Sequence, residues 1–283
     1  MSAIAGLGKP IKGPSALGSD RRRFWHLTRA LAVTDFKLRF FGSALGYLWQ
    51  LMRPLLLFGV LLVVFTQIAR FGDAVPNYAE GLLLAIVLFT FFSEATGGAV
   101  TSLVNRETLV RKIEFPRLAV PLSVVLQASF NLALNTIVVL VFMLAAGVDV
   151  RASWLELPLI IAALAVLSTG ISMLLSAAFV RYRDVSPIWD VLTQILFYAS
   201  GVFFSYETIS SDHEALANAM VLNPIGALLQ QARHAMLGPD YASAATAAGG
   251  WARLLIPFGI TVLLFVWGFV YFDRQAPRIA EEL

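Results

Sequence analysis

Six long stretches of the 283-residue chain are almost free of charge, and they constrain its fold more than any other feature. Two acidic residues, Glu94 and Asp190, lie inside them. At about 1.5 Å per residue, roughly 20 apolar residues cross a hydrocarbon core of about 30 Å. We therefore predict an all-α polytopic membrane protein with six transmembrane helices. Their expected bounds are about 53–70, 81–104, 118–146, 157–180, 187–206 and 254–272.

The composition agrees with this fold class. Hydrophobic residues make up 58% of the chain and charged residues 14%, against about 25% charged residues in an average soluble domain. Mean hydropathy is +0.76, which excludes a soluble enzyme. The chain has no cysteine, and His26, His213 and His234 are far apart in sequence, so we expect neither disulfides nor a metal site.

Lys and Arg are distributed unevenly among the connecting segments. If both termini lie on one side, that side holds all of the 21 basic residues except Arg70, Arg151, Arg233 and Arg253. Positive charge concentrates in cytoplasmic segments, so we predict a multi-pass protein of the cytoplasmic membrane with both termini in the cytoplasm. A disordered tail (1–20) and a short cytoplasmic tail (276–283) are expected at the ends of the chain. The net charge of +3 then reflects topology, and we expect no nucleic-acid partner.

Residues 21–50 are predicted to form an amphipathic interface helix ahead of the membrane domain at 51–275. Large apolar side chains recur at spacings of three, four and seven from Phe24 to Leu45, opposite basic residues. Asp35 and Arg39 are spaced for an i,i+4 pair. Such a helix suits the inner membrane interface, and packing on the bundle is the alternative. The residues assigned to it are Asp35, Lys37, Arg39 and Trp49.

The segment between the second and third stretches is typical of a short charged helix. Asn105 is suited to cap it, and Phe115-Pro116 ends it. This helix is a candidate docking site for another protein, and a solvated loop is the alternative. Its candidate residues are Asn105, Arg106, Glu107, Arg111, Lys112, Phe115, Pro116 and Arg117.

Two short helices are predicted between the fifth and sixth stretches, at about 212–221 and 224–237. Ser211 and Glu214 match a capping box, Asn223-Pro224 supplies an N-cap followed by proline, and Gly238 supplies a stop. Neither helix is long enough to cross a membrane. Each is either re-entrant or lies on the outer surface.

Polar side chains inside the stretches need protein or water as neighbours, because lipid cannot hydrogen-bond them. One stripe, spaced every four residues, consists of Ser123, Gln127, Asn131 and Asn135. It either lines a hydrophilic path or clasps a neighbouring helix. Glu94 and Asp190 are functional candidates because charge at membrane depth is costly. A buried neutral state for Glu94 and an ion pair of Asp190 with Arg181 or Arg183 are the alternatives.

An aromatic cluster ends the fifth stretch, and it consists of Phe197, Tyr198, Phe203, Phe204 and Tyr206. Such rings are typical of the belt at the membrane interface. They also suit sugar rings, whose apolar C–H faces pack on aromatic side chains. The sequence has no phosphate-binding loop, since Lys9 lacks the required spacing, so any ATP is hydrolysed elsewhere or an ion gradient supplies the energy.

Four ordered motifs extend over roughly residues 28–275. They are residues 35–49 (DFKLRFFGSALGYLW) with Pro54, residues 112–117 (KIEFPR), Arg183-Asp184, and residues 222–224 (LNP) with Arg233. Together they resemble the membrane subunit of ABC-2-type exporters, in particular the polysaccharide branch that exports O-antigen, teichoic acid and galactan.

The resemblance implies a non-catalytic six-helix permease that forms a homodimer. It also implies two copies of a separate ATPase, which bind the ATP and Mg²⁺, and no cofactor on this chain. The interface helix and the segment with Phe115-Pro116-Arg117 would face the ATPase. The outer gate would consist of Asn223, Pro224 and Arg233. The substrate path would consist of Gln127, Asn131 and Asn135 together with the aromatic cluster.

We therefore expect ATP-driven export of a lipid-linked polysaccharide across the cytoplasmic membrane. The nearest alternative is an ABC-2 exporter of a drug or small lipid. A membrane-embedded glycan enzyme would need clustered catalytic carboxylates or histidines, and an ion-coupled carrier would favour an internal repeat. Neither feature is visible in the sequence.

Overall fold

The computed structural model describes residues 21–40, 46–68, 75–112, 116–210 and 213–279, and all regular structure within them is helical. Five of the described helices are long and apolar enough to cross a membrane. They are Leu48–Thr66, Tyr78–Val100, Ala119–Ala145, Ala152–Arg181 and Trp251–Gln275. The predicted all-helical class with several membrane-crossing helices is confirmed, and a sixth crossing stays a prediction.

The first of the membrane-crossing helices begins earlier than predicted. It consists of α2 (Gly46–Val63), which continues as the π-helical turn η1 (Val64–Ile68). The prediction placed the start at the charge of Arg53, but arginine is a good helix former and its long side chain reaches polar surroundings from an apolar segment. Residues 46–50 therefore belong to α2, although the sequence assigned them to the interface helix.

The next helices match their predicted positions closely. They are α3 (Tyr78–Val100), α5 (Ala119–Ala145), α6 (Leu157–Arg181) and α12 (Trp251–Gln275), and the 3₁₀ turn η4 (Ala152–Glu156) precedes α6. Two further short elements, η3 (Val104–Arg106) and α4 (Glu107–Lys112), lie between α3 and α5.

The fifth predicted stretch is divided, so a continuous helix over 187–206 is wrong. Helix α7 (Val185–Ala199) has 15 residues and ends before Gly201, whose φ of 68° lies in the left-handed region. At about 1.5 Å per residue α7 is roughly 22 Å long, which is shorter than a hydrocarbon core of about 30 Å. The next helix, α8 (Tyr206–Ser210), begins where the prediction ended the stretch.

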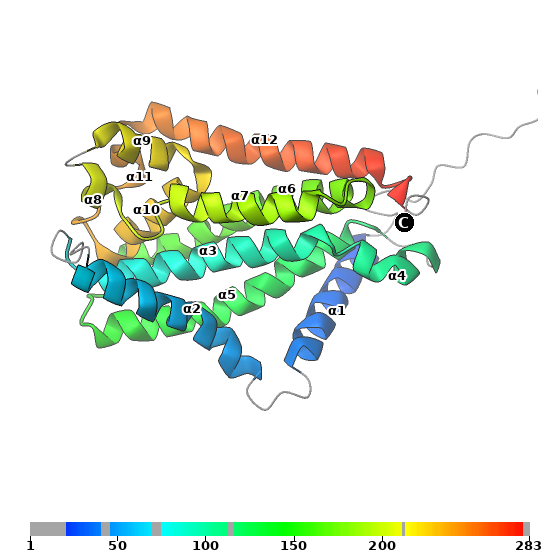
Figure 1. Ribbon diagram of the computed structural model, residues 1–283, viewed down its shortest axis with the longest axis horizontal. Helices are drawn as coiled ribbons and strands as arrows, with labels where there is room; N and C mark the ends of the chain where they lie inside the picture. Colours follow the sequence, from blue (N-terminus) through cyan, green and yellow to red (C-terminus); the bar gives the residue numbers. More distant parts are fainter. Residues whose placement is uncertain (1–20, 41–45, 69–74, 113–115, 211–212, 280–283) are drawn as a thin grey trace, which may run out of the picture.

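Four short helices lie between α7 and α12 within the described residues, where the sequence predicted two. They are α8, α9 (Glu214–Leu222), α10 (Pro224–Leu237) and α11 (Ala244–Ala247). The bounds of α10 agree with the prediction, whereas Ser211 of the proposed capping box lies outside the described residues. We call the described part of residues 200–250 the cap. It lies at one end of the bundle, and α4 lies at the opposite end (Figure 1).

Helix α3 forms the centre of the bundle, where it packs against α2, α5, α6, α7 and α10. Helix α12 packs mainly along α6. This pair approaches closely at Gly170, since a Cβ built there would lie 2.6 Å from the Cα of Phe265. Ser168, Ser172 and Ser176 are buried, and the Ser172 hydroxyl donates to the carbonyl of Ala95 on α3 at 3.1 Å. Small residues thus allow α6 to contact a helix on each side.

Helix α1 (Arg21–Phe40) lies against α5 and crosses the bundle obliquely (Figure 1). It buries Phe24, Thr28 and Ala32, which are spaced every four residues. Trp25 and Leu38 are exposed. The buried face agrees with packing on the bundle, and the exposed apolar residues leave the membrane-interface role as a prediction.

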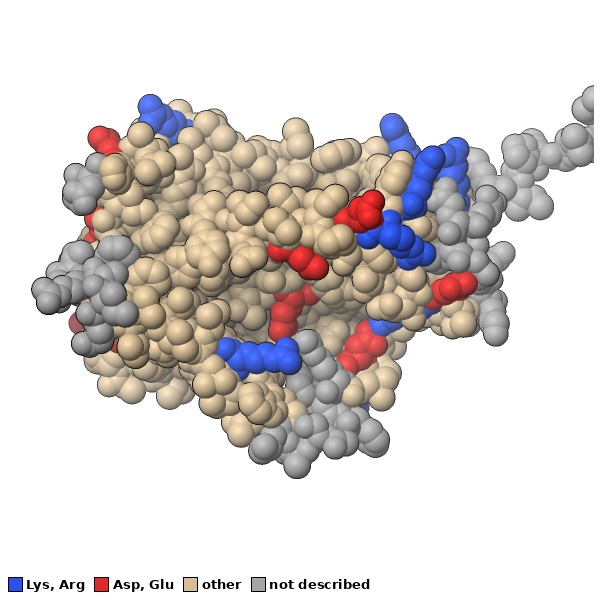
Figure 2. Space-filling view, in the orientation of Figure 1, with Lys and Arg blue, Asp and Glu red and all other residues tan. Residues whose placement is uncertain are grey.

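On the visible face of the molecule, a broad uncharged belt extends from the cap end to a central hollow, which contains acidic side chains (Figure 2). Most Lys and Arg on this face gather at the opposite end, where α4 and the last residues of α12 lie (Figure 2). Such a belt suits a hydrocarbon environment.

Candidate functional site

A partly buried polar cluster joins α3 to α2 and α5 near the C-terminal end of α3. The carboxylate of Glu94 accepts a hydrogen bond from Gln50 Nε2 of α2 at 2.8 Å and another from Asn131 Nδ2 of α5 at 2.7 Å. Gln50 and Asn131 are both buried. An amide donates to each of the two carboxylate oxygens. The position of Glu94 therefore suits a side chain that accepts hydrogen bonds and not one that donates them.

The polar stripe of α5 is turned toward protein. Ser123, Asn131 and Asn135 are buried, and Asn135 Nδ2 donates to the carbonyl of Asn131 at 2.9 Å. Asn131 clasps α3 through Glu94, as the interhelical alternative predicted. Gln127 instead lines a cavity. The stripe thus contains both a clasp and a cavity wall.

This polar cavity has a volume of about 480 Å³ and lies among α1, α3, η3 and α5. Its lining includes Asp35, Glu94, Asn105, Arg106 and Gln127. Acidic residues from two helices and one guanidinium thus share a space between the interface helix and the bundle.

An ion pair closes the cavity wall beside α1. Arg106 of η3 pairs with Asp35 of α1, and its guanidinium also donates to the hydroxyl of Ser123 at 3.4 Å. Asp35 thus pairs with a residue of another element, whereas the predicted Asp35–Arg39 pair stays a prediction because the side chain of Arg39 lies outside the described residues. Sequence spacing favoured the local partner because it gives no information on which loop reaches α1.

The remaining residues of the predicted docking segment are divided between surface and interior. Asn105 is exposed and lies inside η3, where its Nδ2 donates to Thr101 Oγ1 at 3.0 Å, so its predicted capping role is wrong. Glu107 begins α4. Pro116 and Arg117 are buried instead of facing outward. Phe115 and the side chains of Arg111 and Lys112 lie outside the described residues, whereas Lys37 and Trp49 are exposed.

Arg233 of α10 is the central residue of the cap. Its buried guanidinium donates to four backbone carbonyls: those of Gly201 and Val202 at 2.8 Å, Phe204 at 3.3 Å and Gly81 of α3 at 3.4 Å. Burial lowers the pKa of Arg233, with the nearby Tyr241 and Glu207 opposing the shift. Arginine nevertheless stays charged because its ordinary pKa is so high. Arg233 therefore stabilises the turn after α7, and its role in an outer gate stays a prediction.

The same turn receives a second side-chain donor. The hydroxyl of Tyr78 donates to the carbonyl of Phe203 at 2.6 Å. Arg233 and Tyr78 thus satisfy the carbonyls of four consecutive residues after α7. Irregular backbone within a membrane protein is tolerated where buried protein groups hydrogen-bond it, which explains why α7 ends early.

Residues that sequence reasoning missed complete the cap. Gln230 Nε2 donates to Glu207 Oε1 and to the carbonyl of Ala242, both at 3.0 Å, and its oxygen accepts from the amide of Tyr206 at 3.2 Å. One signal was available, because Gln230 and Arg233 are spaced i,i+3 on an otherwise apolar face of α10. Two polar side chains at this spacing are neighbours on the helix surface, and on an apolar face they indicate polar partners inside the protein.

Asn223 and Pro224 start α10 as predicted. Asn223 Oδ1 accepts from the amide of Ile225 at 3.1 Å, which is an N-cap bond, and its Nδ2 donates to the hydroxyl of Ser200 at 2.8 Å. Pro224 occupies the first helical position, where its missing N–H costs nothing. Asn223 thereby joins Ser200, the residue after α7, to the start of α10.

The structure brings most of the predicted aromatic cluster together. Phe203 is buried at its centre, with ring centroids 4.9 Å from Phe197, 5.1 Å from Tyr198 and 6.0 Å from Phe204. Phe65 of η1 stacks on the same ring at 5.2 Å. Tyr206 packs separately beside the residues of α9. Tyr198 is 54% exposed, so the cluster presents one ring at the surface of α7.

Helix α7 also exposes polar groups among apolar ones. Asp190, Gln194 and Tyr198 are exposed and spaced every four residues. Ile188, Val191 and Ile195 are exposed on the same helix. The predicted basic partners of Asp190 lie over aromatic rings instead, with Arg183 5.0 Å from the ring centroid of Phe179 and Arg181 5.5 Å from that of Tyr182. A helix exposed in this way needs a neighbour other than lipid.

The helical bundle and its long apolar helices are typical of a polytopic membrane protein, and comparison with known families identifies the class. The family model of the ABC-2 type transporter matches residues 26–237. The chain therefore belongs to the ABC-2 type transporter family. This confirms the resemblance that the motifs indicated.

Its relatives include three named export proteins. The chain is 28% identical over 200 residues to the O-antigen export system permease protein RfbA of Myxococcus xanthus, covering 71% of this chain and 76% of that protein. It is 24% identical over 250 residues to the protein of the same name from Klebsiella pneumoniae, with 88% and 92% covered. It is 22% identical over 216 residues to the polysialic acid transport protein KpsM of Escherichia coli, with 76% and 82% covered.

Proposed function

We propose that this chain is the permease subunit of an ATP-driven exporter that moves a lipid-linked polysaccharide across the cytoplasmic membrane. The observation that supports this proposal most strongly is the similarity of the chain, over 88% of its length, to an O-antigen export permease. Membership of the ABC-2 family supports a partner ATPase that binds ATP and Mg²⁺, with two copies per exporter. The chain itself supplies the pathway and carries out no covalent chemistry.

The proposed topology has six crossings with both termini in the cytoplasm. Its support is the concentration of Lys and Arg in the segments that would share the cytoplasmic side. In this arrangement α7 and the turn after it, which Arg233 and Tyr78 stabilise, together complete the fifth crossing. The cap then lies at the outer end of the pathway, as part of its mouth.

Coupling to the ATPase is assigned to α1 and to residues 105–117. The ion pair between Asp35 and Arg106 supports this assignment, because it joins α1 directly to the segment that precedes α4. A displacement of α4 by the ATPase would therefore reach α1 through Arg106, and α5 through the Arg106–Ser123 hydrogen bond. Nucleotide binding then biases the bundle between two arrangements.

We assign the dimer contact and part of the substrate path to the exposed face of α7. Asp190 and Gln194 would be unpaired in lipid, whereas a second copy or an aqueous path supplies hydrogen-bonding neighbours. The exposed ring of Tyr198 gives this face a surface on which a sugar ring can pack.

Reconstitution with the ATPase tests the function. In proteoliposomes, ATP hydrolysis by the complex is expected to rise when a lipid-linked polysaccharide is added. Stimulation by a hydrophobic drug or a short lipid, with no response to the glycan lipid, would instead support the small-molecule alternative.

Cross-linking tests the dimer. Because the sequence has no cysteine, Gln194→Cys introduces a single thiol on α7. Oxidation is expected to yield a covalent dimer in membranes. Val262→Cys, on the exposed face of α12, is the matched control and is expected to stay monomeric.

A further inference from the structure

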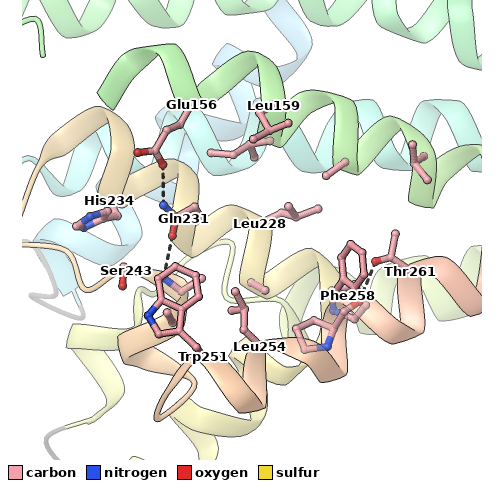
Figure 3. Close-up of a pocket in the computed structure, with 18 of the residues that line it drawn as sticks. Glu156, Leu159, Leu228, Gln231, His234, Ser243, Trp251, Leu254, Phe258 and Thr261 are labelled. Carbon is pink, nitrogen blue, oxygen red and sulfur yellow. Dashed lines mark hydrogen bonds between the residues drawn. The ribbon is translucent and has the colours of Figure 1, made fainter. Parts of the chain in front are cut away.

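A groove with an apolar floor and a polar rim lies among α6, α10 and α12, away from α7 and from the polar cavity. Its volume is about 690 Å³, which is within the range of small-molecule sites. Apolar side chains form most of its wall, with Leu159 and Ala163 from α6, Leu228 from α10, and Leu254 and Phe258 from α12 (Figure 3).

The groove walls are open to the surroundings of the bundle. Leu159 is 73% exposed, Phe258 66% and Trp251 79%. Both α6 and α12 are long and apolar enough to cross a membrane, so these side chains meet hydrocarbon. A groove of this kind in a membrane-crossing bundle is accessible to lipid chains.

The groove extends over the depth of a single leaflet. Its rim lies at the first residues of α6 and α12, marked by Glu156 and Trp251, and its wall continues to Val166 and Val262. These spans of helix correspond to about 15 Å, which is half of a hydrocarbon core of about 30 Å. Trp251 occupies the interfacial level at which tryptophan is enriched.

The rim offers hydrogen-bond acceptors and one negative charge. Glu156 Oε2 accepts from Gln231 Nε2 at 2.8 Å, while Gln231 Oε1 accepts from the amide of Ala244 at 3.0 Å (Figure 3). Both functional atoms of Gln231 are thereby used, and Gln231 holds Glu156 in place. His234 Nδ1 lies 2.6 Å from the carbonyl of Tyr241, which can only accept, so Nδ1 is the donor of this hydrogen bond.

The charge of the rim selects among lipids. Glu156 is the one Asp, Glu, Lys or Arg among the described residues that line the groove. A carboxylate favours a cationic donor and disfavours an anionic headgroup. Phosphatidylethanolamine and phosphatidylglycerol both carry a phosphate, but only the first adds a primary ammonium, whose three donors can make a charge-assisted hydrogen bond to Glu156.

We propose that this groove is a binding site for one phosphatidylethanolamine molecule, with an acyl chain between α6 and α12 and its ammonium on the Glu156 carboxylate. The bound lipid contacts Leu228 and Gln231 of α10, and therefore supports the helix that carries Arg233. The groove shares Pro224 with the predicted outer gate but contains none of the residues assigned to the substrate path, and the lipid site does not depend on that path.

Native mass spectrometry of the full chain tests the proposal. The protein is released from vesicles of equal parts phosphatidylethanolamine and phosphatidylglycerol, and lipid adducts are counted. We expect one retained phosphatidylethanolamine per chain. Ala163→Trp fills the groove and is expected to lower this adduct about tenfold, because losing contact with a few methylene groups is sufficient.

Two further variants separate the site from general lipid adhesion. Ala162→Trp places the same ring on the adjacent exposed position outside the lining and is expected to keep the adduct. Glu156→Gln keeps the side-chain size and is expected to abolish the preference for the ethanolamine headgroup. Equal adduct levels in Ala163→Trp and Ala162→Trp would overturn the site. Equal retention of both lipids by the unaltered protein, or preferential retention of phosphatidylglycerol, would overturn the assigned occupant.

Discussion

The two ends of the bundle are held together in different ways. In the cap, the buried guanidinium of Arg233 binds four carbonyls, and Gln230 and Tyr78 make further buried hydrogen bonds. At the opposite end, α1 is joined to η3 by the pair of Asp35 and Arg106, whose side chains are 27% and 19% exposed, beside a polar cavity.

This difference indicates where the protein changes shape. Breaking a hydrogen bond to a buried charge leaves unpaired groups and costs about 1–3 kcal/mol or more, whereas a partly exposed ion pair contributes about 0–1 kcal/mol. The cavity also gives side chains room to rearrange. We therefore expect the movement driven by the ATPase at the α1–η3 end, with the cap as the fixed reference.

Replacement of Arg233 should have the largest effect on stability. Arg233→Met leaves four buried carbonyls without their donor, and we expect the free energy of unfolding to fall by about 3–5 kcal/mol. Thermal unfolding in detergent measures the loss. Arg253→Met, at an exposed position at the same end, is the control and is expected to change stability by less than about 0.5 kcal/mol. Equal midpoints for both variants would show that the cap does not depend on Arg233.

The Glu94 cluster should come next. Glu94→Gln places an amide opposite one of the two donors, Gln50 or Asn131, and we expect a loss of about 2 kcal/mol in the same unfolding assay. Asn131→Asp in the Glu94→Gln background exchanges donor and acceptor and should recover most of that loss. A double variant no more stable than Glu94→Gln would contradict the assigned hydrogen bonds.

The ion pair should matter little for stability and much for coupling. Asp35→Ala is expected to cost no more than about 1 kcal/mol, because the pair is partly exposed. The stimulation of ATP hydrolysis by glycan lipid should nevertheless fall severalfold. Combining Asp35→Arg with Arg106→Asp restores an opposite-charge pair and should restore stimulation. Full stimulation in both single variants would refute the link between α1 and η3.

The exposed face of α7 should show the smallest effect on stability. Asp190→Asn is expected to change the free energy of unfolding by less than about 0.5 kcal/mol, since the side chain is exposed in the single chain. If this face lines the path or the dimer contact, export of glycan lipid should still decrease. Unaltered export by Asp190→Asn and Tyr198→Ala together would remove α7 from the proposed path.

Hydrophobic patterning predicted the long helices well, because each needs only an apolar segment of sufficient length. It failed after α7, where the residues up to Tyr206 are as apolar as a helix but the backbone turns at Gly201. That turn depends on Arg233 and Tyr78, which are distant in sequence. A local pattern contains no information on such partners.

The candidate site was predicted only in part, as the fold was. Helical spacing placed the polar stripe of α5 on one face, and the N-cap chemistry of Asn223 gave the start of α10. The partners of Glu94 and Asp35 could not be predicted, because each lies on another helix. The family resemblance placed Arg117 on the surface that faces the ATPase, yet its side chain is buried.

Hydrogen exchange of the intact exporter tests the difference between the two ends most directly. Amide exchange would be compared in the presence and absence of ATP and glycan lipid. We expect altered exchange in α1 and in residues 104–112, with unchanged protection in α9 and α10. Altered exchange confined to the cap, with α1 and η3 unaffected, would contradict it.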